Sequence, residues 1–149
     1  MKTTSSAEEA VALENQRSLV GSVRKGPWSN TSLQGTFVGT ATGTVPASFL
    51  GGDPSSSLPI TMWFQYTFDG EGHIDPAFGE ATIGGRPSGL IKARGTYSID
   101  PETGMGMETI TLPGGRTLTR RFSLSNDNTQ LHWVSVDPGF QFMGTMQMQ

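Results

Sequence analysis

The chain has 149 residues, and its 10 Lys and Arg against 13 Asp and Glu give a formal net charge of -3. The basic residues are scattered along the chain, so we expect no nucleic acid as a partner. Cysteine is absent, which excludes a disulfide framework, thiolate catalysis and zinc sites built on cysteine. No apolar stretch reaches the roughly 18 residues of a membrane span and the first residues lack a signal-peptide pattern, so we expect a cytoplasmic protein with no membrane partner.

Residues 6–24 carry a helical pattern. Ser6 and Glu9 form a capping box, and Gly26 with Pro27 ends the pattern. The segment either packs over one end of the domain or forms a partly ordered tail. Its larger apolar residues include Val11, Leu13, Leu19 and Val20. Because these would otherwise face water, we favour packing.

From Leu33 onward, apolar and polar residues alternate between turn-forming stretches that recur about every ten to fifteen residues. The turns are rich in Gly, Pro, Asn and Asp, and nearly all are of hairpin length, so consecutive strands should be antiparallel neighbours. We expect eight strands, over residues 33–45, 58–68, 73–83, 89–99, 105–112, 116–125, 129–137 and 140–148.

Eight meandering strands leave two exposed edges unless the sheet closes into a barrel. We therefore predict an all-β fold, an eight-stranded antiparallel up-and-down β-barrel at residues 33–149, preceded by an N-terminal α-helix and linker at residues 1–32. A sandwich of two sheets is the alternative architecture. The long connection 46–57, rich in Gly, Ser and Pro, is a candidate flap over an open end of the barrel.

Two charged residues share a face with apolar neighbours in the strands on either side of the Pro-Gly-Gly turn. Counting across that turn places Glu108 opposite Arg120, and counting across the preceding turn places Tyr97 opposite Glu108. A three-residue loop at 126–128 would put His132 on the same inward face. We therefore expect Tyr97, Glu108, Arg120 and His132 to form one polar cluster inside the barrel.

This cluster has two interpretations. As a catalytic site, Arg120 would orient or polarise a ligand oxygen, Glu108 or His132 would move a proton, and Tyr97 would donate a hydrogen bond. As a structural element, it would be a buried ion pair whose spare lone pair is satisfied by the tyrosine hydroxyl.

Aromatic and sulfur-containing side chains dominate the expected apolar lining. The candidate ligand-binding residues are Met62, Phe64, Tyr66, Ile110, Phe122, Val134, Phe140, Phe142 and Met146. Small residues are expected to face inward as well: Gly35, Gly39, Ala41, Ala77, Gly79, Ala81, Ala93, Gly95 and Gly144. Large residues on some strands and small ones on others favour an off-centre cavity, the alternative being a barrel filled by its own side chains.

Other reaction classes have little support in the sequence. His73 and Asp75 are too few for a transition-metal site, so we expect no metal and no cofactor. The chain has no Gly-x-Ser-x-Gly elbow of a serine hydrolase, and 84–88 lacks the ending of a phosphate loop.

Four short stretches of strand and turn are typical of one protein family. They are Gly35-Thr36-Phe37, Tyr66-Thr67-Phe68-Asp69-Gly70-Glu71-Gly72, Gly95-Thr96-Tyr97-Ser98-Ile99 and Phe142-Met143-Gly144-Thr145. With these the chain resembles, over residues 33–148, the small bacterial lipocalin-like (calycin-type) β-barrels, and it is similar to allene-oxide-cyclase-like barrels. The resemblance implies binding of a small apolar molecule and, in some members, its isomerisation or cyclisation in natural-product biosynthesis. It assigns no catalytic residue in this chain.

We therefore expect a barrel that encloses a hydrophobic small molecule and isomerises or cyclises it, as a polyketide- or terpenoid-like intermediate. Such chemistry needs a shaped apolar cavity, exclusion of water and one or two polar groups. The alternatives are a non-catalytic binding or carrier protein that uses the same cavity, and a structural domain with a filled barrel. The sequence leaves the oligomeric state open, a homodimer included.

Overall fold

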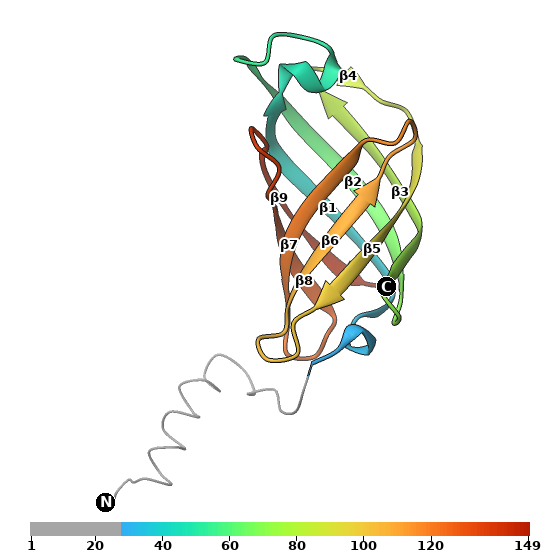
Figure 1. Ribbon diagram of the computed structural model, residues 1–149. Coiled ribbons are helices and arrows are strands. Elements are labelled where there is room, and N and C mark those ends of the chain that lie inside the picture. Colours follow the sequence, from blue (N-terminus) through green and yellow to red (C-terminus); the bar gives the residue numbers. More distant parts are fainter. Residues whose placement is uncertain (1–27) are drawn as a thin grey trace, which may run out of the picture.

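Nine strands form one antiparallel sheet in the computed structural model, which describes residues 28–149 (Figure 1). The strands are β1 (Gln34–Pro46), β2 (Ser57–Asp69), β3 (His73–Ile83), β4 (Arg86–Pro87), β5 (Ile91–Ile99), β6 (Met105–Thr111), β7 (Thr117–Leu124), β8 (Gln130–Ser135) and β9 (Gln141–Met148). Two short 3-10 helices, η1 (Asn30–Ser32) and η2 (Ala47–Leu50), flank β1. The helix predicted over 6–24 lies outside the described residues. None of the helices in the described part of the chain is long and apolar enough to cross a membrane.

The sheet closes because β2 pairs with both β1 and β3. The strand order β2-β1-β9-β8-β7-β6-β5-β3 then forms a ring of eight strands, and β4 is an extra two-residue strand paired with the end of β3. The predicted eight-stranded antiparallel barrel is confirmed, and the alternative of a two-sheet sandwich is wrong.

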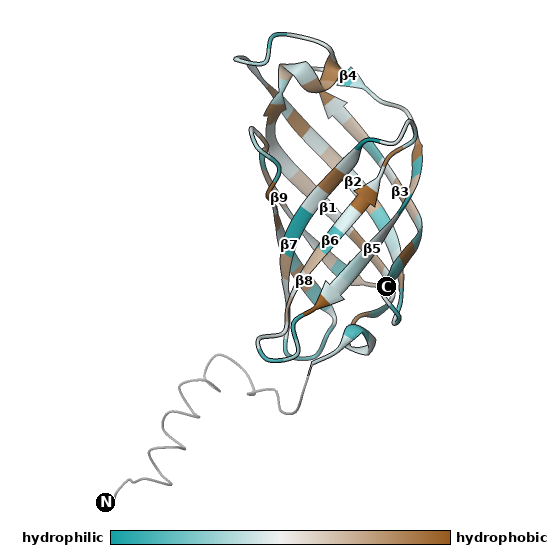
Figure 2. Ribbon diagram, viewed as in Figure 1, coloured by the Kyte–Doolittle hydropathy of each residue, from teal (hydrophilic) through white to brown (hydrophobic). Residues whose placement is uncertain are grey.

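The alternation of side chains explains why these residues form barrel strands. In β7, Leu118, Arg120 and Phe122 are buried, while Thr117 and Arg121 are exposed. Figure 2 shows the resulting alternation of hydrophobic and hydrophilic residues along the strands. Each strand thus presents one face to the interior and the other to water.

One end of the barrel is closed by the chain segment that precedes β1. The Tyr97 hydroxyl donates to the backbone oxygens of Asn30 and Leu33, at 3.0 and 2.7 Å. Below it the rings of Phe37, Phe68 and Tyr97 pack edge to face, with centroids 5.4 and 5.2 Å apart. These contacts fill this end of the barrel, and a cavity lies toward the opposite end, under η2.

The predicted orientation of β8 is wrong. Phe122 lies opposite Trp133 rather than His132, so Trp133 is buried while His132 and Val134 face outward. The loop between β7 and β8 has four residues, 126–129, between the paired Ser125 and Gln130, instead of the three expected. One added residue turns every side chain of a strand to the other face.

A second difference restores the orientation of β9. Trp133 pairs with Gly144 and Leu131 with Met146, one residue away from the expected register. Because this shift follows the first, Phe142 and Met146 are buried as predicted.

Candidate functional site

A cavity of about 330 Å³ lies inside the barrel beneath η2. Phe49 and Leu50 of η2 lie over it, and strands from both sides of the barrel line it. The apolar lining includes Val45, Ile60, Met62, Ala81, Ile83, Ile91, Leu112, Leu118, Phe140 and Phe142. Its volume is of the order of small-molecule pockets in proteins, which start at about 300 Å³.

A second, smaller cavity of about 40 Å³ lies deeper in the barrel. Five residues line both cavities: Met62, Ala81, Ile91, Leu112 and Leu118. The deeper cavity adds the small side chains of β3 and β5 that the sequence placed inward, Ala77, Gly79 and Ala93. Tyr66 and Arg120 line it as well. The two cavities therefore adjoin: an apolar mouth lies under η2, and we call the deeper end beside Tyr66 and Arg120 the polar floor.

Arg120 of this floor forms an ion pair with Glu108, which does not itself line the two interior cavities. The two residues are opposite each other on β6 and β7, as predicted, and Arg120 Nη1 donates to Glu108 Oε2 at 3.1 Å. Both residues are 1% exposed. The same Nη1 donates to the hydroxyl of Tyr66 at 2.7 Å. The sequence predicted Tyr66 only as an apolar lining residue, but its hydroxyl is the group that bonds to the Glu108–Arg120 ion pair.

The guanidinium of Arg120 is enclosed by aromatic rings. It lies 4.1 Å from the ring centroid of Trp133, and 5.9, 5.8 and 5.9 Å from those of Phe64, Tyr66 and Phe142. Stacking on an indole stabilises a cation that has left water. Sequence reasoning missed Trp133, but one signal was present: Gly144, directly opposite on β9, where a Cβ would lie 2.9 Å from the indole.

The cluster around the polar floor has buried groups that can still form hydrogen bonds. Within residues 28–149, four buried side-chain atoms have no hydrogen-bond partner: Glu108 Oε1, Arg120 Nε, Arg120 Nη2 and Trp133 Nε1. All four belong to this one cluster. Buried polar atoms are nearly always paired in folded proteins, so their concentration around Arg120, which lines the deeper cavity, points to a partner that comes from outside the chain.

Burial changes the acid–base properties of the cluster. It raises the pKa of the Glu108 carboxyl above its usual range, and the charge of Arg120 opposes this effect without cancelling it. Burial also raises the pKa of the Tyr66 hydroxyl. For Arg120, burial lowers the pKa, but Tyr66 and Glu108 raise it by more, so the guanidinium stays charged. The site therefore combines a fixed cation with a carboxyl that accepts a proton more readily than an exposed one.

Two of the four residues predicted as catalytic lie elsewhere. Tyr97 is opposite Glu108 as expected, but its hydroxyl bonds the backbone at the closed end. His132 is exposed on the outer surface. The predictions that these two residues belong to the cluster are wrong. The alternation of side chains along a strand determines neither the direction in which a long side chain extends nor the length of the β7–β8 loop.

The predicted ligand-binding residues divide into three groups. Those lining the interior cavities are Met62, Tyr66, Ile110, Phe140 and Phe142. Phe64, Phe122 and Met146 are buried in the packed part of the barrel. Val134 is 46% exposed on the outside, so its placement in the lining was wrong.

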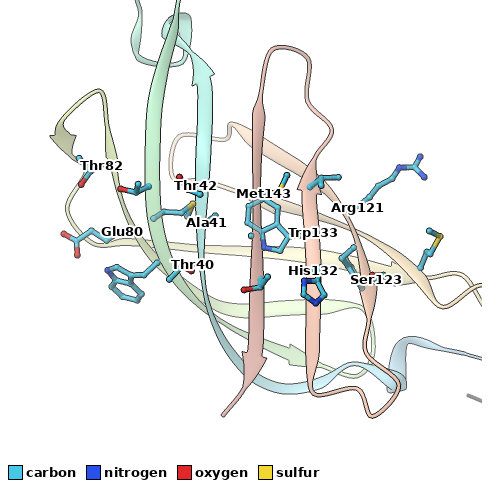
Figure 3. A pocket seen from close by; sticks show the side chains of 18 residues that line it. Thr40, Ala41, Thr42, Glu80, Thr82, Arg121, Ser123, His132, Trp133 and Met143 are labelled. Atoms are coloured by element: carbon cyan, nitrogen blue, oxygen red, sulfur yellow. The ribbon is translucent and has the colours of Figure 1, made fainter. Parts of the chain in front are cut away.

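The outer surface of the barrel also carries a broad groove, of about 1140 Å³, shown in Figure 3. Thr82 and Glu80 of β3 border it on one side, and Arg121 and Ser123 of β7 on the other. His132 lies within it (Figure 3). The groove is larger than the interior cavities but open to solvent, and its exposed side chains include several threonines. A small apolar ligand is better shielded from water inside the barrel.

In the described part of the chain, no three His, Asp or Glu side chains lie close enough together to hold a metal ion. Comparison of the chain with models of protein families, with curated proteins and with solved structures finds no match.

Proposed function

We propose that this protein binds a hydrophobic small molecule inside the barrel, through the mouth beneath η2. The observation that carries the proposal is the apolar cavity of about 330 Å³, which adjoins a deeper cavity lined by Arg120, whose Nε and Nη2 have no hydrogen-bond partner within residues 28–149. The expectation from lipocalin-like barrels, an apolar ligand held inside the strands, agrees with this assignment.

A pair of neighbouring residues on β3 tests it. Ala81 lines both interior cavities, whereas Thr82 faces outward and borders the outer groove. We expect the neutral apolar dye N-phenylnaphthylamine to bind with increased fluorescence at about one site per chain. Ala81→Phe should fill the cavity and abolish binding, and Thr82→Phe should leave it unchanged. The reverse pattern would place the ligand in the outer groove and contradict the proposal.

A second function is favoured by the raised pKa of Glu108 beside a fixed cation. We propose that the bound molecule is isomerised or cyclised, with Arg120 and Tyr66 polarising an oxygen and Glu108 exchanging a proton. A positioned acid or base contributes about 100- to 10,000-fold to a rate. The natural substrate would be a polyketide- or terpenoid-like intermediate, and a carrier would use the same cavity without chemistry.

Proton exchange at a carbon next to a carbonyl separates the enzyme from the carrier. In heavy water, the enzyme should place deuterium on the α-carbons of methyl octyl ketone, and Glu108→Gln should reduce the rate at least about 100-fold while dye binding persists. An exchange rate equal to that of buffer would exclude this catalytic role and leave a carrier. Recovery of a ligand unchanged after long incubation, checked by mass spectrometry, would agree with that outcome.

A further inference from the structure

The polar groups at the floor of the cavity are mainly hydrogen-bond donors. Arg120 Nη1 already donates to Glu108 and Tyr66, and Nε and Nη2 have no partner within residues 28–149. In a guanidinium, the Nε–H and one Nη2–H point in parallel along the edge away from Nη1. The free donors therefore form one edge, which suits an oxygen with two lone pairs.

Tyr66 adds a further donor. A guanidinium nitrogen can only donate, so the Tyr66 oxygen accepts from Arg120, and its own hydroxyl hydrogen remains available. Within residues 28–149 this hydroxyl donates to no other group. Tyr66 and Arg120 both line the deeper cavity, where the inner end of a ligand would lie.

The charge of the floor argues against an anion. Glu108 Oε2 lies 3.1 Å from Arg120, and whenever Glu108 is ionised the pair carries no net charge. At this floor a ligand carboxylate would add a charge that no further cation balances, since the lining of the deeper cavity contains no Lys or Arg besides Arg120. Burying an unbalanced charge is far more costly than burying a neutral oxygen that accepts hydrogen bonds.

We infer that the ligand is a neutral, apolar carbonyl compound that enters carbonyl end first, so that its oxygen accepts hydrogen bonds from Tyr66 and Arg120. Its hydrocarbon part occupies the larger cavity, whose lining is apolar. This inference rests on the proposed binding function, and it adds the chemical class of the ligand and its orientation.

Three probes of similar length test the class: decane, methyl octyl ketone and decanoate, each measured by displacement of N-phenylnaphthylamine at neutral pH. The ketone should bind about tenfold more tightly than decane, the effect of one or two hydrogen bonds to a charged donor, and more tightly than decanoate. Equal binding of ketone and decane, or strongest binding of decanoate, would overturn the inference and leave the binding function standing. Failure of the dye and all three probes to bind would overturn the binding function itself.

The carbonyl stretching frequency of the bound ketone tests the orientation. Hydrogen bonds from Tyr66 and Arg120 should lower it relative to the ketone in hexane. Tyr66→Phe removes one donor, keeps the ring, and should return part of the shift and of the ketone preference. Tyr97→Phe is the matched control, because its hydroxyl bonds the backbone of Asn30 and Leu33 at the closed end. An unshifted band in the wild type, or equal effects of both variants, would contradict the predicted orientation.

Discussion

The guanidinium of Arg120 is stacked on the indole of Trp133, with the Arg120 Cζ atom 4.1 Å from the ring centroid. The two residues come from neighbouring strands, β7 and β8, and each is 1% exposed. The indole covers one face of a cation whose edge is held by Glu108 and Tyr66. Trp133 thereby fixes the plane in which Arg120 presents its remaining donors.

Replacing Trp133 should be costly. Trp133→Ala removes the largest fully buried side chain and uncovers the guanidinium, so we expect a loss of about 3–5 kcal/mol in the free energy of unfolding. Trp63→Ala, at a position 41% exposed on β2, is the control and should change stability by less than about 1 kcal/mol. Urea denaturation measures both, and similar losses would mean that Trp133 has no special role.

The ion pair should behave as a unit. Arg120→Met alone leaves a buried carboxylate without its cation, and we expect a loss of about 3–5 kcal/mol. The double variant Glu108→Met with Arg120→Met replaces both groups by apolar side chains and should recover most of that loss. A double-mutant cycle in urea checks this expectation, and strictly additive losses would show that the two residues do not depend on each other.

Stability should depend on pH through Glu108. Its folded-state pKa is raised above the usual 4.5, so the folded state retains the proton to higher pH than the unfolded chain. The contribution of Glu108 is therefore fully present below 4.5 and is lost as the pH rises through the folded-state pKa. We expect the difference in unfolding free energy between the wild type and Glu108→Gln to fall over that range. A difference that grows with pH would mean that the carboxyl is preferentially ionised in the fold.

Two surface carboxyls change stability with pH in the opposite direction to Glu108. For this reason the quantity to measure is the difference in unfolding free energy between the wild type and Glu108→Gln. Hydrogen bonds from His73 lower the pKa of Asp69, and hydrogen bonds from Thr129 lower that of Asp127. Their contributions are present above the unfolded value of 3.8 and are lost as the pH falls below it. Both occur equally in the wild type and in Glu108→Gln, so subtraction removes them.

Arg116 should control how fast a ligand leaves. Its Nη1 donates to the backbone oxygen of Phe49 at 2.6 Å, and its guanidinium lies 4.3 Å from the Phe49 ring centroid. These contacts hold η2 over the mouth. Arg116→Ala should increase the dissociation rate of the dye about fivefold, as expected for the loss of about 1 kcal/mol. Arg121→Ala on the outer face should leave the rate unchanged, which stopped-flow displacement can measure.

Met62 should set the length of ligand that fits. Its side chain lines both interior cavities, so it forms part of the boundary between them. Met62→Ala should widen the passage between the two spaces and shift the preference toward ketones longer by about two carbons. Met143→Ala, at a position 60% exposed, is the control. An unchanged preference in Met62→Ala would show that the ligand does not pass this residue.

Most of the architecture could be predicted because turn residues and alternation define strands locally. The opposed positions of Glu108 and Arg120 follow from one turn, in which Gly114 and Gly115 adopt φ of +96° and +93°, a region that favours glycine. Each additional turn adds an uncertainty of one residue, however. At β8 that uncertainty placed His132 inside the barrel in the prediction, where the structure has Trp133.

The detailed site required more than register. The alternation of side chains correctly placed Tyr66 and Tyr97 on the inner face, but it does not show toward which end of the barrel a side chain extends. Tyr66 reaches Arg120, and Tyr97 reaches the backbone near η1. The space expected beside Gly39 and Gly144 is likewise closed: a Cβ on either would meet backbone of the neighbouring strand at 1.9 or 2.5 Å.

In residues 28–149 the closed end beside η1 leaves one opening for a ligand, beneath η2. Tyr97 and residues 28–33 close the other end, so a molecule that enters beneath η2 must leave by the same path. Two ligands cannot pass each other in a single-file space, and an incoming molecule has to wait for the resident one to depart. Exchange should therefore be independent of the concentration of the competitor once it is in excess, and a product would inhibit simply by remaining in place.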